Sequence, residues 1–351
     1  MSGGLNPAAA SLLPEALNQG WTYRDRISSR EAGLLLTEVY ARRHRHSSQA
    51  VWLERLAAGQ IQRNGAPLWQ DTPLQAGDRL SWQRPPWREP AVPAAWGVVH
   101  DDGDLLVIDK PNGLPVLPAG GFLEHTVLRL LERRHRHDPA GVPRPVHRLG
   151  RATSGLLVCA RSPDTRARLS RQLRESTAVG RGDGPPDGAM AAGRGVHKLY
   201  RALLVPGVLA LQPGQTVVID TPIGRRPHPR LGALWCAAGD PSPGQDSAVL
   251  PARSRLTLLE RHPQADLVQV AIDSGRPHQI RIHCAALGAP LLGDPLYRPG
   301  GSADPQALPG EGGYRLQAWR LELPQPQGGW LQLEVPEPLS LAPDSSGPPR
   351  G

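Results

Sequence analysis

Short apolar runs, separated by turn residues, restrict the fold of this chain more than any other feature of its sequence. Several of these runs between residues 96 and 338 alternate with polar residues at period two, as half-buried antiparallel strands do. The expected strands cover Leu105–Ile108, Leu156–Ala160, Leu199–Val205, Val217–Ile219, Leu256–Leu259 and Leu267–Ile272. Helical patterns are fewer, at Thr126–Arg134 and Asp164–Glu175. The pattern predicts an α+β fold with a mixed, mainly antiparallel sheet and flanking helices.

A smaller α+β module is expected in front of this sheet, over residues 26–84. Two helical stretches, Glu31–Ala41 and Val51–Ala57, precede an Asn-Gly turn at Asn64 and a Gly-Asp turn at Gly77. Composition sets the remaining boundaries: a loose tail over 1–25, a proline-rich linker over 85–95, the main domain over 96–338 with a disordered insertion at 178–195, and a flexible tail over 339–351.

The charge of the chain points to a polyanionic partner. Its formal net charge is +8 and its pI is about 10.1, and binding to phosphates releases counterions. Of its 40 basic residues only Lys110 and Lys198 are lysines, and both fall in the motifs described below. The three cysteines show no metal-like or disulfide spacing, and no leader segment or long apolar run is evident. We therefore expect a cytoplasmic protein that does not enter a membrane.

Four motifs carry the functional interpretation. In chain order they are a Lys-Pro-Asn-Gly turn ending the run Val99–Pro115, the segment His147-Arg-Leu-Gly-Arg-Ala-Thr-Ser-Gly155, the segment Lys198-Leu-Tyr-Arg-Ala202, and Gly275-Arg-Pro-His-Gln-Ile-Arg-Ile-His283 continuing to Tyr297. Together they resemble the RluA-type RNA pseudouridine synthases. The module at 26–84 resembles an S4-type RNA-binding domain through Leu56–Gly65 and its Gly-Asp turn.

The resemblance implies a reaction on RNA, either rRNA or tRNA, by a monomer that uses no cofactor and no metal. The reaction breaks the N1–C1′ bond of uridine, rotates the uracil and forms a C5–C1′ bond. The base must first leave its stack. A carboxylate is then needed beside C1′, and an opposite charge nearby keeps that carboxylate ionised.

Site residues are transferred from the family motif by motif. Tyr200 is expected to stack on the detached uracil, and Arg281 is expected to pair with the catalytic carboxylate. For His147 and His278 hydrogen-bonding roles are favoured over proton transfer. The residues expected to contact RNA are Arg148, Arg151, Lys110, Lys198, Arg276, His278 and Gln279. The His- and Arg-rich clusters at 42–46 and 133–137 lack further ligands at metal spacing, so no metal site is expected.

Gly150 stands where the family keeps its catalytic aspartate. A glycine supplies neither a nucleophile nor a base, and this leaves two hypotheses open. The chain is an enzyme that uses another carboxylate, for which Asp294, Asp273 and Asp109 are the candidates nearest the motifs. Alternatively, it is a non-catalytic RNA-binding or RNA-folding protein. If the rest of the site is preserved, Gly150→Asp is expected to restore or raise activity.

Overall fold

The computed structural model describes residues 12–175, 196–229, 231–238, 249–272, 275–325, 329–339 and 341. The expected insertion at 178–195, most of the expected C-terminal tail and the candidate acid Asp273 lie outside these ranges. The chain divides into two units. The larger comprises Met1–Pro14, Ala91–Arg226 and Trp235–Gly351, and the smaller comprises Glu15–Pro90 and Pro227–Leu234. Among the described helices none combines the length and apolar character needed to cross a membrane.

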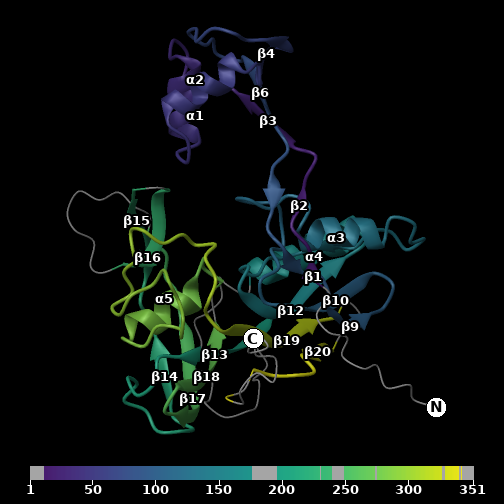
Figure 1. Cartoon of the computed structure of the whole chain (residues 1–351). Coiled ribbons are helices and arrows are strands. Elements are labelled where there is room, and N and C mark those ends of the chain that lie inside the picture. Colours follow the sequence, from purple (N-terminus) through teal and green to yellow (C-terminus); the bar gives the residue numbers. More distant parts are fainter. Residues whose placement is uncertain are drawn as a thin grey trace, which may run out of the picture. The chain divides into compact units, whose positions relative to one another are not determined.

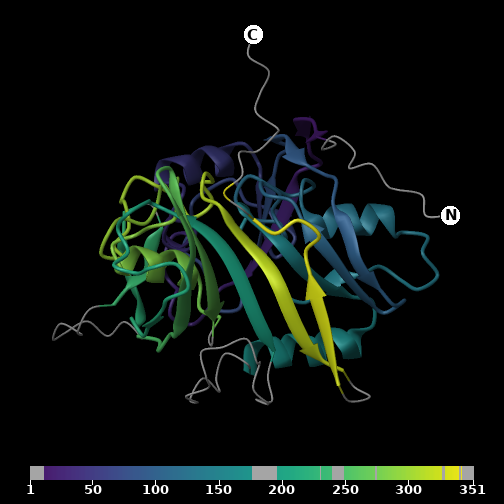
Figure 2. The ribbon, with the colours of Figure 1, turned by 90° about the horizontal axis from the view of Figure 1, so that it is seen from below.

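The larger unit is built on a ten-stranded mixed sheet (Figure 1). Its strands are β9 (Gly97–Asp101), β10 (Leu105–Lys110), β11 (Arg144–Pro145), β12 (Thr153–Ala160), β13 (His197–Leu204), β14 (Thr216–Ile219), β17 (Ser254–His262), β18 (Ala265–Ile272), β19 (Leu316–Pro324) and β20 (Trp330–Glu334). The order is β14-β17-β18-β13-β19-β12-β10-β9, with β11 on β12 and β20 on β19. Figure 2 shows β13, β19 and β20 side by side. Among the described pairs of this sheet, β12 and β19 alone run parallel, which confirms the expected mixed, mainly antiparallel sheet.

Three helices cover the sheet. α3 (Val127–Arg134) packs against Leu157 and Cys159 of β12, whereas α4 (Pro163–Glu175) packs with Leu156 and Val158. Successive residues of a strand face opposite sides, so these two helices lie on opposite faces. α5 (Gln279–Ala286) packs on the half of the sheet formed by β13, β17 and β18. The sequence predicted α3 and α4 but not α5. Residues 279 to 285 are buried all round, so α5 has no polar stripe to reveal it.

The smaller unit contains a four-stranded antiparallel sheet and two helices. The elements are β3 (Trp21–Arg26), α1 (Leu36–Arg43), α2 (Gln49–Ala57), β4 (Ile61–Arg63), β5 (Ala66–Pro67) and β6 (Arg79–Arg84), and the sheet order is β3-β6-β4-β5. Its core is aromatic: the rings of Tyr40 and Trp82 pack on Trp52, at centroid distances of 4.6 and 4.8 Å. Both predicted helices are present, although α1 begins five residues after the expected Glu31.

The expected N-terminal tail and linker need correction. β1 (Leu12–Leu13) pairs with β8 (Val92–Pro93), and β2 (Ala16–Leu17) pairs with β7 (Arg88–Glu89). β3 begins at Trp21, also within the expected tail. Two-residue ladders are too short to show a hydrophobic period, so the sequence pattern did not reveal them. A further hairpin in the chain is formed by β15 (Ile223–His228) and β16 (Gly232–Ala237).

Candidate active site

A pocket of about 380 Å³ lies beside the central parallel strand pair of the larger unit. Thr153, at the start of β12, and Leu316, at the start of β19, are paired across the two strands, and both line the pocket. Eight of the ten predicted site residues also line it: Arg148, Gly150, Lys198, Tyr200, Arg276, His278, Gln279 and Arg281. They come from the second, third and fourth motifs, so the structure brings together segments that lie far apart in the sequence.

The Thr-Ser-Gly sequence of the second motif is explained by the strand pairing. Gly155 has φ +100°, and a Cβ atom there would lie 2.2 Å from the carbonyl oxygen of Ala318 on β19. Any other residue would force the two strands apart. The amide of Thr153 donates to the carbonyl oxygen of Gly150 at 3.0 Å, which closes the turn before β12. The close strand approach therefore fixes Gly150 at the pocket wall.

Lys110 does not line the pocket and instead holds the backbone of this turn, so its expected contact with RNA stays a prediction. Its side chain is fully buried, and its ammonium donates to the carbonyl oxygens of Pro111, Leu114 and Arg151 at 2.8, 2.8 and 3.2 Å. Burial lowers the pKa of Lys110 to about 7. The amide of Gly113 also donates to the Arg151 carbonyl, at 2.9 Å. The first motif thus holds the backbone that follows Gly150.

The side chain of Arg151 also lies outside the pocket lining. Its Nε donates to the carbonyl oxygen of Gly310 at 2.9 Å, and its guanidinium lies 5.6 Å from the centroid of the Phe122 ring. Arg151 therefore ties the turn to a distant loop. Arg148, in contrast, is exposed at the pocket.

Tyr200 and Lys198 reach the pocket from β13, where residues two apart share a face. Burial raises the pKa of Tyr200 to about 12, so its phenol is neutral near pH 7. Burial lowers the pKa of Lys198 to about 8, and its ammonium donates to the carbonyl oxygen of Leu173 at 3.4 Å. An aromatic ring and a cation are thus placed on one wall. The stacking role of Tyr200 stays a prediction.

Arg281 enters from α5 and is already paired with a carboxylate. Its Nε and Nη2 donate to the two oxygens of Asp294, each at 2.7 Å, and both side chains are buried. Although burial opposes it, the hydrogen bonds with Asp294 raise the pKa of Arg281. Asp294 also accepts from the amides of Leu296 and Tyr297. The carboxylate partner of Arg281 in this structure is therefore Asp294, and both carboxylate oxygens accept hydrogen bonds from it.

Two motif histidines make hydrogen bonds inside the protein. His147 Nε2 accepts from the amide of Val158 at 3.0 Å, and burial lowers its pKa to about 3. His278 Nδ1 lies 2.7 Å from Tyr297 Oη, and burial lowers the pKa of His278 to about 4. Both imidazoles are therefore neutral near pH 7, in keeping with hydrogen-bonding roles.

Gln279 lines the pocket, and its expected contact with RNA stays a prediction. It is buried, and its amide group donates to the Arg253 carbonyl at 2.8 Å and to Ser254 Oγ at 3.0 Å. Its oxygen accepts from the amide of Arg276, whose own Nε donates to the Pro251 carbonyl. Gln279 therefore shapes the loop that carries Arg276 to the pocket.

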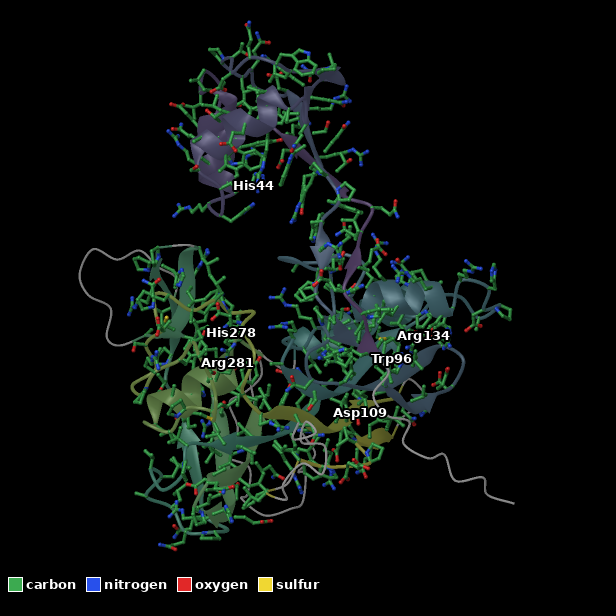
Figure 3. All side chains as sticks on the ribbon, viewed as in Figure 1. His44, Trp96, Asp109, Arg134, His278 and Arg281 are labelled. Carbon is green, nitrogen blue, oxygen red and sulfur yellow. The ribbon has the colours of Figure 1, made fainter. Side chains whose placement is uncertain are left out.

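No aspartate or glutamate belongs to the pocket lining among the described residues. Asp109 lies on β10, apart from His278 and Arg281 (Figure 3), and burial raises its pKa. Asp273 is outside the described residues, although its neighbour in sequence Ile272 lines the pocket. Among the described residues, neither Asp294 nor Asp109 lines the pocket.

The space beside Gly150 is taken by a residue that the motifs did not indicate. A Cβ atom at residue 150 would lie 2.8 Å from Tyr314 Oη and 3.2 Å from Thr153 Oγ1. Tyr314 lines the pocket and precedes β19, in a segment that belongs to none of the four motifs. A side chain at residue 150 therefore requires the Tyr314 hydroxyl to shift, and the expected effect of Gly150→Asp stays a prediction.

The sequence of this chain was compared with protein families and with known proteins, and the matches give its class. The family model for RNA pseudouridylate synthase matches residues 104–286, so the chain belongs to the RNA pseudouridine synthase family, a family of isomerases. An RNA pseudouridine synthase of Synechocystis sp. is 39% identical over 87% of this chain and 92% of its own length. RNA pseudouridine synthase 5 of Arabidopsis thaliana is 37% identical over 92% of this chain and 94% of its own length.

More distant relatives cover a smaller share of this chain. Ribosomal large subunit pseudouridine synthase D of Nitrosomonas europaea is 33% identical over 70% of this chain and 63% of its own length. The structure of human RNA pseudouridylate synthase domain containing 1 is 23% identical, with a TM-score of 0.48, over 70% of this chain and 84% of that one.

Proposed function

We propose that this chain isomerises a uridine to pseudouridine in structured RNA, either rRNA or tRNA, as a cytoplasmic monomer. The observation that carries the proposal is the single pocket that collects Tyr200, Arg281 and the Arg148–Gly150 turn from three separate motifs. RNA is the substrate class of the family to which the chain belongs.

The pocket offers suitable partners for an unstacked nucleotide. A base drawn out of its stack needs an aromatic face inside the enzyme, and Tyr200 provides one at the pocket wall. The side chains of Arg148, Arg276 and Lys198 line the same pocket and supply positive charge for flanking phosphates. Arg281 also lines this pocket, and its buried ion pair with Asp294 holds its guanidinium in place.

We further propose that the smaller unit is an S4-like RNA-binding domain. It places two helices beside an antiparallel sheet, with the Asn64 turn between β4 and β5. Exposed arginines on it, among them Arg24, Arg42 and Arg45, suit contacts with an RNA backbone.

A non-catalytic RNA-binding role is the second candidate, and the absence of a lining carboxylate among the described residues favours it. The two candidates predict the same binding and differ in chemistry. A protein that has lost its nucleophile is expected to bind RNA normally and to form no product.

Pseudouridine mapping on rRNA and tRNA transcripts incubated with the protein separates the two. We expect pseudouridine at a defined uridine with the natural chain, and a large loss with Tyr200→Ala and Arg148→Ala. Arg320→Ala is the matched control for lost charge, since this arginine pairs on the surface with Glu334 of the neighbouring strand. RNA binding without pseudouridine in any transcript would establish the non-catalytic role.

A further inference from the structure

Tyr314 takes the place beside Gly150 that a longer side chain would otherwise fill. Its hydroxyl oxygen would lie 2.8 Å from a Cβ atom at residue 150, and its side chain is buried at the pocket wall. The hydroxyl thus stands near the position from which an acid at residue 150 would act. The Tyr314 phenol fits beside residue 150 because glycine has no side chain there.

The Tyr314 ring is held in a defined orientation. The guanidinium carbon of Arg281 lies 4.3 Å from the ring centroid, and the hydroxyl lies 3.5 Å from Thr153 Oγ1. The preceding Gly313 has φ +121°, and a Cβ atom there would lie 2.6 Å from the carbonyl oxygen of Gly293. The backbone before Tyr314 therefore passes directly against the residue before Asp294, and the Arg281–Asp294 pair fixes the ring from one side.

We propose that the Tyr314 hydroxyl performs at C1′ the role that the family gives to its carboxylate. This inference rests on the proposed function. Tyrosine serves as a nucleophile at sugar carbons in some glycosidases, so a phenol is chemically able to replace a carboxylate there. Positive charge from Arg281 beside the ring stabilises negative charge that develops on the oxygen during the reaction.

The step is balanced without any further reactant. Tyr314 Oη forms a bond to C1′ while the N1–C1′ bond breaks, and the uracil leaves with the electron pair and takes the phenolic proton. After the uracil rotates, its C5 attacks C1′ and the C1′–Oη bond breaks, returning the electron pair to Oη. The proton on C5 then passes to Oη, which restores the phenol and leaves pseudouridine.

The test compares the natural chain with Tyr314→Phe, Gly150→Asp and the double variant, by pseudouridine mapping, RNA binding and thermal unfolding. Tyr314→Phe is expected to lower the rate by about a thousandfold or more, with RNA affinity and melting temperature little changed. Gly150→Asp is expected to be inactive, because its side chain meets the Tyr314 hydroxyl. The double variant is expected to be more active than either single variant, since removing the hydroxyl makes room for the carboxylate.

Two further variants make the result specific. Tyr40→Phe removes a hydroxyl buried in the core of the smaller unit and controls for a general effect of this substitution. Asp273→Asn tests the acid that adjoins the pocket in sequence. Full activity of Tyr314→Phe, or loss of activity in Asp273→Asn alone, would overturn this inference while the proposed function stands. A natural chain that binds RNA and forms no pseudouridine overturns the proposed function, and this step with it.

Discussion

At the scale of single residues, the buried amino group of Lys110 is hydrogen-bonded to the backbone and not to a carboxylate. Its three donors are matched by three carbonyl oxygens, one of them from Arg151, the residue after Gly150. A buried polar group without a partner is costly, whereas a matched set of hydrogen bonds stabilises a unique local structure. Lys110 therefore holds in place the backbone that follows Gly150.

Lys110→Met is expected to lower the free energy of unfolding by about 3 kcal/mol, because the three carbonyl groups lose their buried donor. Urea unfolding at pH 7 measures the change. Lys198→Met is the matched control: the ammonium of Lys198 donates to the carbonyl oxygen of Leu173 at 3.4 Å, a longer hydrogen bond, so its loss is expected to cost less. Equal losses in the two variants would show that the hydrogen bonds of Lys110 add nothing beyond the packing of its side chain.

Single residues also show where inference from sequence ends. The motifs indicated that Arg148, Gly150, Tyr200 and Arg281 belong to one site, and the structure places all four on one pocket. Motifs identify residue types but not the partners of their hydrogen bonds, so the pairing of Arg281 with Asp294 could not be read from spacing. No sequence motif indicated Tyr314 as a site residue, because what distinguishes it is only that its hydroxyl lies close to Gly150 in the folded chain.

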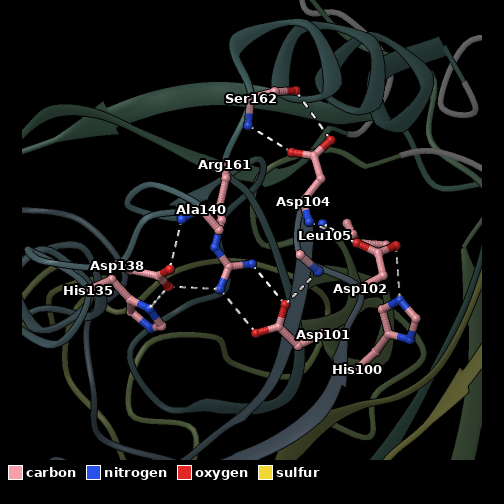
Figure 4. A network of polar contacts seen from close by, with 11 residues as sticks. His100, Asp101, Asp102, Asp104, Leu105, His135, Asp138, Ala140, Arg161 and Ser162 are labelled. Carbon is pink, nitrogen blue, oxygen red and sulfur yellow. Dashed lines mark hydrogen bonds and ion pairs between the residues drawn. The ribbon is translucent and has the colours of Figure 1, made fainter.

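At the scale of elements, Arg161 joins three segments at the far end of β12 (Figure 4). Its guanidinium donates to both oxygens of Asp101, at the end of β9, at 2.8 and 3.0 Å, and to Asp138, after α3, at 3.4 Å. Asp138 is also 2.9 Å from His135 Nδ1. The hydrogen bonds from Arg161 lower the pKa of Asp101, so this contact depends on an ionised carboxylate.

Asp101→Asn is expected to lower the free energy of unfolding at pH 7, and this loss is expected to be smaller at acid pH. The folded pKa of Asp101 lies below its unfolded value of about 3.9, so its contribution is complete above that pH and is lost as the pH falls below it. The difference between the urea midpoints of the natural chain and the variant should therefore stay constant from pH 7 to about pH 4 and shrink as the pH falls further. Glu311→Gln, on an exposed loop, is the control for a lost surface carboxylate. A difference that stays constant over the whole pH range would contradict the assignment.

Element prediction succeeded where a hydrophobic period was visible. α3 was expected at Thr126–Arg134 and found at Val127–Arg134, with Thr126 as its N-cap, its Oγ1 accepting from the amide of Arg129. α5 was missed because helices buried on all sides show no amphipathic period. β1 and β8 were missed because two residues cannot show a period at all.

At the scale of the whole molecule, the chain begins in the larger unit, leaves to form most of the smaller unit, and returns. The β1·β8 ladder pairs Leu13 with Val92, so Pro14 and Ala91 follow as the next facing positions of the same antiparallel pair. Composition could not reveal this path, because the closing contact joins residues about eighty positions apart. Removing residues 1–90 would therefore delete β1 and leave β8 without its partner strand, whereas removing residues 15–90 alone would keep the β1–β8 pair.

Replacing residues 15–90 by Asn-Gly should join β1 to β8 as a two-residue hairpin and leave the larger unit folded. If the smaller unit binds RNA, this excised variant should bind RNA more weakly. Its affinity should also fall less steeply as the salt concentration rises. Each lost phosphate contact releases about one counterion fewer, which lowers the slope of log affinity against log salt concentration by close to one. Filter binding to structured RNA across a salt series measures both quantities. Removal of residues 1–90 is the comparison, and it should melt at a lower temperature because β8 loses its partner. An excised variant with unchanged affinity and slope would show that phosphate contacts come from the larger unit, where Arg148, Arg276 and Lys198 line the pocket.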